Sequence, residues 1–414
     1  MIGERYAILA RRIVTCDPAR ATPDDPLGAI DAGAVVVEKG IIADVGSRAE
    51  VLSKNPGIDV AIDAEGVVTP GLVDAHTHAA WVGSRDGEYA MRMAGADYEA
   101  IAAKGGGIAA SSKAIREASL AEVVETLRAR LRRMAALGVT TVEVKSGYGL
   151  DEANERKQLE AAAEVSRAGD LPRIVPTYLA LHALPKEAGG DREAYAHTVM
   201  TSWLPAIAAA KLAAFVDAYI DRSAFSVDQA RGVLSKAREL GLGVRAHVGQ
   251  FADVGGAELA AELGAASVDH LEQVSPRGIE ALASRGVRAV LLPVASFTLR
   301  QSPPPIEALR AAGVKLVVAS DANPGTAPTE SLPLALAMAI RSYELSIPEA
   351  ILGATREAAA SLSLGGTCGE LREGLRADLV IWDLPHENAI VQPWGGPRTR
   401  AVIRDGVPIM QAGG

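Results

Sequence analysis

The middle of the chain, from about residue 70 to residue 364, alternates apolar runs typical of strands with amphipathic runs typical of helices. Helical runs such as 121–137, 151–167 and 226–240 lie between eight strand-like runs. Eight β/α units in succession predict a TIM-type (β/α)8 barrel. The alternative, an open doubly wound sheet, lacks the Gly-x-Gly-x-x-Gly that would follow an early strand. The expected strands span residues 67–73, 139–144, 174–180, 212–219, 244–248, 267–269, 287–292 and 314–320.

Both ends of the chain differ from this middle, because they carry short strand-like runs without long helices. Residues 35–46 place two apolar runs around a Lys-Gly turn, which predicts a hairpin, and two further short runs follow residue 376. Chain ends often lie close together, so we expect these segments to pair. The prediction is a small β-sandwich domain formed by residues 1–68 and 366–414, beside a barrel domain of residues 69–365.

Composition restricts what the protein can bind. The chain has 414 residues, a hydrophobic fraction of 49% and a net charge of −9, without a cluster of Lys and Arg to follow a phosphate backbone. We therefore expect no nucleic-acid partner and, since no long stretch is free of charge, no membrane partner. Two cysteines predict no disulfide framework, and the first residues lack the pattern of a signal peptide. The expected compartment is the cytoplasm.

Four of the seven histidines fall where predicted barrel strands end, and the last strand is followed by an aspartate. In such barrels the carboxyl ends of the strands carry the active site. Imidazole and carboxylate are common ligands of zinc and iron, so these side chains predict a metal site. Taken singly, each could instead be a core histidine or a helix-capping aspartate. The residues are His76, His78, His247, His270 and Asp321.

Longer motifs carry a resemblance to known proteins. Pro-Gly-Leu-Val-Asp-Ala-His-Thr-His at 70–78, together with the later histidines and the Ser-Asp at 320–321, resembles the amidohydrolase superfamily. Lys-Ser-Gly-Tyr-Gly-Leu at 145–150 and Asp-Ala-Asn-Pro-Gly-Thr at 321–326 are similar to motifs of its imidazolonepropionase family, as is Gly-Gly-Gly-Ile at 105–108. The resemblance implies hydrolytic opening of the anionic ring compound 4-imidazolone-5-propanoate to N-formimidoyl-L-glutamate, a step of L-histidine degradation.

The resemblance also implies roles for single residues. One divalent or trivalent ion, zinc or iron, would be held by His76, His78, His247 and Asp321. Asp321 would move the proton of the attacking water, and His270 would orient that water or stabilise negative charge. Gln250 completes the expected catalytic set. The expected substrate-binding residues are Arg85, Tyr98, Tyr148, His182, Gln250, Asn323, Gly325 and Thr326.

Alternatives remain open from the sequence. A deaminase or another cyclic amidohydrolase would share the metal ligands, but Gln250 stands where deaminases place a glutamate, and glutamine cannot ionise. Lys145 could be carboxylated and bridge two metals, although one metal is expected. Arg85 could be a surface arginine paired with Asp86 or Glu88, and Tyr98 could pack in a lid. A non-catalytic scaffold is disfavoured because every metal-site position is filled. A homodimer is plausible for this barrel class.

Overall fold

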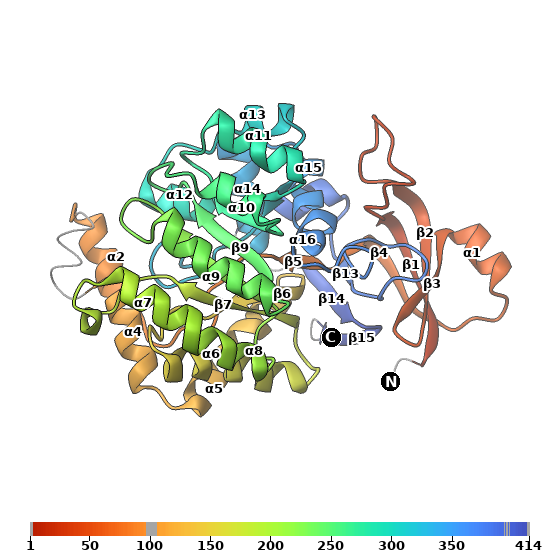
Figure 1. Ribbon diagram of the computed structural model, residues 1–414. Helices are drawn as coiled ribbons and strands as arrows, with labels where there is room; N and C mark the ends of the chain where they lie inside the picture. The colour runs from red at the N-terminus through yellow and green to blue at the C-terminus, as the bar shows by residue number, and fades with distance from the viewer. Residues whose placement is uncertain (1–2, 97–105, 393, 395, 397, 412–414) are drawn as a thin grey trace.

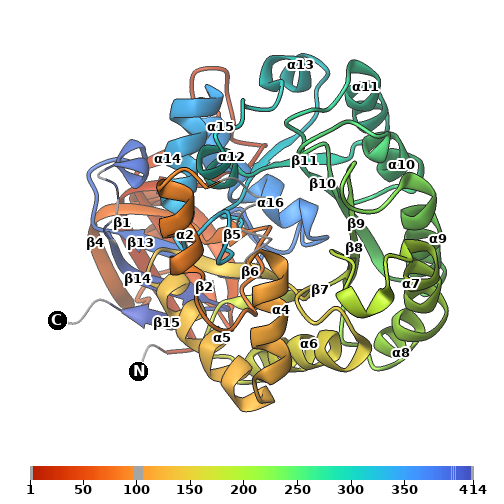
Figure 2. The same cartoon turned by 90° about the vertical axis from the view of Figure 1, so that its left-hand side faces the viewer.

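The computed structural model describes residues 3–96, 106–392, 394, 396 and 398–411. Within them, parallel strands form an eight-stranded sheet in the order β12-β11-β10-β9-β8-β7-β6-β5, with helices around it (Figure 2). A parallel bridge between Thr77 and Ala322 joins the segments that follow the first and last strands. The predicted barrel is confirmed. Its strands are β5 (Leu72–Asp74), β6 (Val139–Lys145), β7 (Arg173–Leu181), β8 (Phe215–Ile220), β9 (Gly243–Val248), β10 (Ser267–His270), β11 (Arg288–Leu291) and β12 (Leu316–Val318).

The barrel helices begin at recognisable capping residues. Ser119 and Ser226 each form a capping box with the residue three positions on, and Asp151 caps α6 by accepting from the backbone N–H of Asn154. The helices are α2 (Asp86–Met93), α4 (Ile108–Glu117), α5 (Leu120–Ala135), α6 (Glu152–Arg167), α7 (Arg192–Thr198), α8 (Leu204–Ala209), α9 (Val227–Glu239), α10 (Gly256–Glu262), α11 (Pro276–Arg285), α12 (Pro293–Leu299), α13 (Ile306–Ala311), α14 (Leu332–Tyr343), α15 (Ile347–Gly353) and α16 (Arg356–Ser361), with short turns η1 (Lys186–Ala188), η2 (Val199–Trp203) and η3 (Glu387–Val391).

The two ends of the chain meet in a second sheet beside the barrel (Figure 1). Its described strands run in the order β15-β14-β13-β4-β1-β2-β3, and β4 pairs with β1 on one side and with β13 on the other. Ile8, Val35, Ile381 and Ile403 share one buried cluster, so both ends contribute to its core. The strands are β1 (Arg5–Val14), β2 (Ala29–Glu38), β3 (Ile41–Ser47), β4 (Val60–Pro70), β13 (Leu379–Trp382), β14 (Thr399–Arg404) and β15 (Val407–Gln411), and α1 (Arg48–Lys54) follows β3.

One predicted strand, residues 67–73, is divided between the two sheets. β4 ends at Pro70 in the terminal sheet, and β5 begins at Leu72 in the barrel. Gly71 lies between them, and its N–H donates to the carbonyl of Asp378 at 2.9 Å. A Cβ at this position would overlap the Thr140 side chain, so only glycine allows the close approach. The apolar run therefore crosses from one sheet to the other instead of ending in either.

The terminal sheet is fastened to the amino ends of barrel strands. Arg173, the first residue of β7, has its Nη2 2.8 Å from Asp405 Oδ1 and also pairs with Asp378. A Cβ at Gly138, just before β6, would overlap the Trp382 ring of β13, so this indole packs directly on the barrel. These contacts leave the carboxyl ends of the barrel strands to the polar residues that follow them. No helix among the described residues is both long and apolar enough to span a bilayer.

Candidate metal centre and active site

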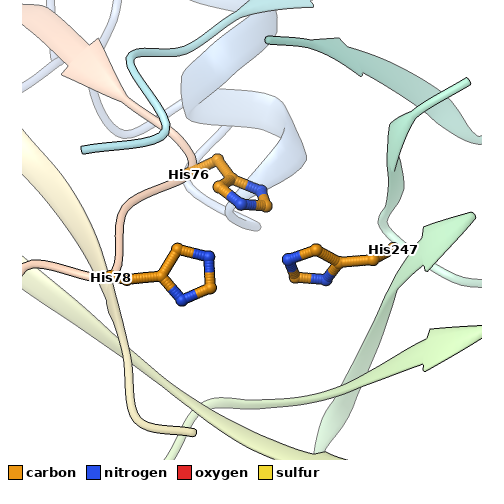
Figure 3. Close-up of side chains that lie close together, drawn as sticks. All are labelled: His76, His78 and His247. Atoms are coloured by element: carbon orange, nitrogen blue, oxygen red, sulfur yellow. The ribbon is translucent and has the colours of Figure 1, made fainter. Parts of the chain in front are cut away.

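Three imidazoles converge at the carboxyl end of the barrel. His76 and His78 lie just after β5, His247 lies near the end of β9, and one ring nitrogen from each lies within 4.8 Å of the others (Figure 3). Asp321 joins them after β12, with its Oδ1 3.3 Å from His76 Nε2 and 3.5 Å from His78 Nε2. All four side chains are buried. The predicted ligand set is thus brought together in one place.

Backbone contacts fix the two segments that carry three of these side chains. The N–H of Asp321 donates to the carbonyl of His76 at 3.0 Å, and the N–H of His78 donates to the carbonyl of Ala322 at 3.0 Å. Asp321 has a φ of +54°, a left-handed conformation that costs energy for a residue other than glycine. Strain of this kind is found where the surrounding structure holds a functional group in place.

The donor set fits a metal ion. Among the described residues, His76 Nε2 and His247 Nε2 are buried yet have no hydrogen-bond partner. Burial, reinforced by neighbouring positive groups, lowers the pKa of His76, His78 and His247 well below the usual range, so each ring is neutral and offers a lone pair. Burial raises the pKa of Asp321 to about 7, and a cation beside it would favour the carboxylate.

The other nitrogens of two ligand rings are held by carboxylates that the sequence reasoning did not identify. Asp269 Oδ2 accepts from His76 Nδ1 at 2.8 Å, and Asp217 Oδ1 accepts from His247 Nδ1 at 3.0 Å. Because a carboxylate can only accept, each Nδ1 carries the hydrogen, and each Nε2 is directed into the cluster. This arrangement is the usual support of a metal-binding histidine.

Charged residues below the histidines form a buried charge layer, consisting of Glu143, Lys145, Asp217, Arg245 and Asp269. Lys145 Nζ lies 2.7 Å from Asp217 and 2.9 Å from Glu143, and Arg245 lies 3.0 Å from Glu143 and 3.4 Å from Asp269. All five side chains are fully buried. The signal in the sequence was a charged residue at inward-facing positions of apolar strands, as in Val-Glu-Val-Lys at 142–145.

The surroundings of Lys145 bear on the alternative in which a carboxylated Lys145 bridges two metal ions. Its ammonium contacts Glu143, Asp217 and Asp269. Although burial lowers the pKa of Lys145, these three carboxylates outweigh it and raise the pKa above its usual value. A lysine must lose its proton before it can be carboxylated, so this environment favours the expected single metal.

Two further residues of the predicted catalytic set border the histidines. The ring centroid of His270 lies 5.5 Å from that of His247, and its Nδ1 is 3.7 Å from Glu272 Oε2. Burial lowers the pKa of His270, but Glu272 and other carboxylates raise it to a net value above the usual range. The Tyr219 hydroxyl donates to Gln250 Oε1 at 2.7 Å, which leaves the Gln250 amide N–H groups as its free donors.

Arg85 belongs to the wall of the site, a name for the side chains beside the histidine cluster that also include Tyr148, His182 and the turn at Asn323. Only 8% of its side chain is exposed, and its Nη2 is 2.7 Å from Glu88 Oε2. The arginine is therefore paired with Glu88, as one alternative expected, but it is not a surface residue. A Cβ at Gly325 would overlap the guanidinium, so the glycine admits Arg85 to the wall. Arg92 of α2, which sequence reasoning did not select, donates to the Gly325 carbonyl at 3.0 Å.

The segment after Asp321 forms a turn built by one amide. Asn323 Oδ1 accepts from the N–H of Gly325 at 2.8 Å and from the N–H of Thr326 at 2.7 Å. Asn323 is thus a residue that shapes the wall, and its Nδ2 donates to the Asp321 carbonyl at 2.7 Å. The turn connects Asp321 to the glycine beside Arg85. Tyr98 lies outside the described residues.

Tyr148 and His182 form the adjacent part of the wall. The Tyr148 ring centroid lies 5.8 Å from that of His78 and 5.4 Å from that of His182. His182 Nδ1 lies 2.7 Å from the Gly147 carbonyl, which can only accept, so Nδ1 carries a hydrogen. Burial lowers the pKa of His182 to about 4, which leaves the ring neutral and Nε2 as an acceptor. In this tautomer Nε2 can accept a hydrogen bond but cannot donate one to a carbonyl oxygen.

A (β/α)8 barrel with a neutral histidine cluster and an aspartate at its carboxyl end defines the metal-dependent amidohydrolase class, and residues 87–409 match the model of the amidohydrolase family. The chain is 46% identical over 390 residues to an imidazolonepropionase of Acidiphilium cryptum, covering 93% of this chain and 94% of that protein. It is 44% identical over 372 residues to one of Mesorhizobium japonicum, covering 89% and 90%. The chain belongs to the imidazolonepropionase family.

Solved structures show the same fold at lower identity. A triazine hydrolase from Arthobacter aurescens superposes with a TM-score of 0.75 at 18% identity, covering 98% of this chain and 95% of that one. An adenosine deaminase from Xanthomonas campestris with bound zinc gives a TM-score of 0.72 at 18% identity, covering 97% and 92%. Family membership and the donor set of the histidine cluster together support a metal cofactor.

Proposed function

We propose that the chain hydrolyses 4-imidazolone-5-propanoate to N-formimidoyl-L-glutamate in L-histidine degradation. The observation that carries the proposal is the 46% identity to an imidazolonepropionase over nearly the whole chain. The site agrees with it, because the neutral histidine cluster with Asp321 and the largely buried Arg85 both border Tyr148. A hydrolytic centre and a carboxylate-binding group are what this reaction requires.

His76, His78, His247 and Asp321 would hold the metal ion, and we propose zinc or iron, since imidazole and carboxylate suit both. When bound, a metal of this kind lowers the pKa of water to about 7 and polarises a carbonyl oxygen. Asp321 would accept a proton from the attacking water and return it to the ring nitrogen that leaves when the amide C–N bond breaks. His270 would orient that water.

Arg85 would bind the propanoate group. A guanidinium presents paired donors that match a carboxylate, and its charge persists at every relevant pH. Glu88 already occupies one edge of Arg85, so the substrate would approach the remaining Nη1 edge, on the side of Gly325. The nearby turn of Asn323 and Thr326 would shape this subsite, and Tyr98 remains a predicted contact.

The imidazolone ring would lie against Tyr148 and His182, whose own rings are already in contact. Because the neutral His182 has its hydrogen on Nδ1, its Nε2 would accept a hydrogen bond from a ring N–H instead of donating to the carbonyl. The Tyr148 hydroxyl is a donor, and its pKa is raised by burial, so it stays protonated. Gln250 would donate an N–H to the substrate, since Tyr219 occupies its oxygen.

The experiment is to supply purified, metal-loaded protein with freshly made imidazolone propanoate, follow the loss of ring absorbance, and identify N-formimidoyl-L-glutamate by mass spectrometry. Chelation should abolish turnover, and zinc or iron, added separately, should restore it. Release of ammonia from a neutral nucleobase, with no reaction of imidazolone propanoate, would instead support the deaminase alternative. We further propose that the enzyme acts in the cytoplasm on a free small anion, without a nucleic-acid or membrane partner, and as a homodimer.

A further inference from the structure

The loop of residues 146–150 carries Tyr148 and the Gly147 carbonyl, yet its backbone follows an unusual path. Gly147 has a φ of +111° and Leu150 a φ of +58°. A Cβ at Gly149 would overlap the backbone of Asn154 and Glu155, so the loop rests directly on the first turn of α6. Such a path leaves backbone N–H groups that cannot bond within the loop and need acceptors elsewhere.

Two side chains of α6 supply those acceptors. Glu155 accepts from the N–H of Gly147 at 2.7 Å through Oε2, and from the N–H of Leu150 at 2.8 Å through Oε1. Gln158, one helical turn further on, accepts from the N–H of Tyr148 at 3.1 Å. Both side chains are buried, at 1% exposed each. Three N–H groups of one five-residue loop are thus held by one face of one helix.

The same face also reaches the segment that carries the metal ligands. Gln158 Nε2 donates to the carbonyl of Ala80 at 2.9 Å, two residues after His78. Gln158 therefore ties the backbone of Tyr148 to the backbone that follows His78, which agrees with the 5.8 Å spacing of their rings. On the other side of the loop, the Gly147 carbonyl receives the hydrogen bond of His182.

We propose that Glu155 and Gln158 are positioning residues for the substrate, which hold the loop of residues 146–150 so that Tyr148 faces the ring and the Gly147 carbonyl fixes the tautomer of His182. The inference rests on the proposed function for the identity of the substrate. Neither side chain touches the metal ligands. This pair of residues, Glu155 and Gln158, which we call the clamp, therefore affects substrate binding and leaves the hydrolytic centre unchanged.

Glu155→Gln tests the clamp, because the amide keeps the shape but turns one acceptor oxygen into an N–H donor facing a backbone N–H. Hydrogen exchange of the peptide covering residues 146–150 should accelerate, while metal content stays at the wild-type value. The KM for imidazolone propanoate should rise about tenfold with kcat within about twofold. Glu164→Gln, an equal charge change at an exposed position of the same helix, should behave as the wild type.

A double-mutant cycle separates positioning from general loosening. In a Tyr148→Phe background, Glu155→Gln should raise KM only about threefold, since the part of its effect that passes through the tyrosine hydroxyl has already been removed. An equal tenfold rise in both backgrounds would overturn the proposal, as would unchanged exchange of the loop. If Glu155→Gln does not fold, Gln158→Met provides the same measurements, with the two backbone hydrogen bonds to Tyr148 and Ala80 removed.

Hydrogen exchange also distinguishes this inference from the proposed function. If the wild type does not consume imidazolone propanoate, but the loop exchanges faster in Glu155→Gln than in the wild type, the proposed substrate is refuted and the positioning role of Glu155 is supported. If the wild type turns the substrate over, but Glu155→Gln changes neither the loop exchange nor KM, the positioning role is refuted and the proposed substrate is supported.

Discussion

The buried charge layer, which forms the floor of the site, and the wall beside the histidines are built in different ways. The floor is the buried charge layer below the histidines, and its five side chains all project from barrel strands. The wall, which includes Arg85, Tyr148 and the turn at Asn323, comes from loops and a helix terminus that need hydrogen bonds from elsewhere to keep their shape. The floor should therefore govern stability and metal binding, whereas the wall should govern substrate affinity.

Lys145→Met should give the largest effect, because it removes the cation from among three buried carboxylates. Breaking a buried ion pair from one side typically costs about 3 to 5 kcal/mol, so the free energy of unfolding should fall by that order. Metal content, which we expect to be about one ion per chain in the wild type, should fall as well, since Asp217 would no longer be held against His247. Denaturant unfolding and elemental analysis measure both quantities.

The control for Lys145→Met is Arg156→Met, because Arg156 forms an exposed pair with Glu160 on α6. Exposed pairs contribute little, so this variant should match the wild type in stability and metal content. Equal destabilisation by the two substitutions would contradict the distinction between floor and surface. Two metal ions per wild-type chain would replace the one-metal arrangement.

Asp321 lies where the floor and the wall meet. Asp321→Asn should mainly abolish turnover. The amide keeps the shape but cannot take the proton of water, so kcat should fall about a hundredfold to ten-thousandfold. His270→Ala should also lose turnover, but with its metal retained, because His270 is not one of the four proposed ligands. Stopped-flow absorbance and metal analysis of both variants make the comparison. A metal-loaded His270→Ala protein with full activity would show that its predicted role is wrong.

Arg85→Met tests the wall alone. Loss of a charge-assisted bond of about 1.5 to 3 kcal/mol should raise KM for the propanoate substrate about tenfold to a hundredfold. Stability should fall less than in Lys145→Met, because Glu88, although only 14% exposed, keeps the hydrogen bond from the Gly107 N–H. A neutral imidazolone without the propanoate should bind weakly to the wild type and respond little to the substitution. An unchanged KM for the propanoate substrate would remove Arg85 from the wall's binding function.

Tyr148→Phe should give the smallest effect of the series. Only one neutral hydrogen bond to the ring is lost, so KM should rise about threefold to fivefold while metal content and unfolding stay at wild-type values. Steady-state kinetics would measure KM, and calorimetry would measure unfolding. A loss of metal in Tyr148→Phe would mean that wall and floor are not separable, since the ring lies close to His78.

The parts of this architecture that depend on local patterns could be predicted from sequence. Alternating apolar and amphipathic runs define the barrel, and the histidines at strand ends converge as expected. The division at Gly71 could not be foreseen, because a continuous apolar run carries no mark of which sheet each half joins. The roles of Asp217 and Glu155 were also missed. Each depends on a partner far away or on a neighbouring loop, and a strand or helix pattern specifies neither.

The crossing at Gly71 has a mechanical consequence. From Pro70 to His76 the chain passes from the terminal sheet to the first histidine of the cluster through the short strand β5 alone. Tension applied to the terminal sheet would therefore reach the histidine cluster along the backbone itself, before any helix of the barrel is disturbed. In a single-molecule pulling experiment, detachment of β4 and release of the metal would be expected in one event, so the terminal sheet behaves as an anchor of the catalytic centre rather than as a detachable module.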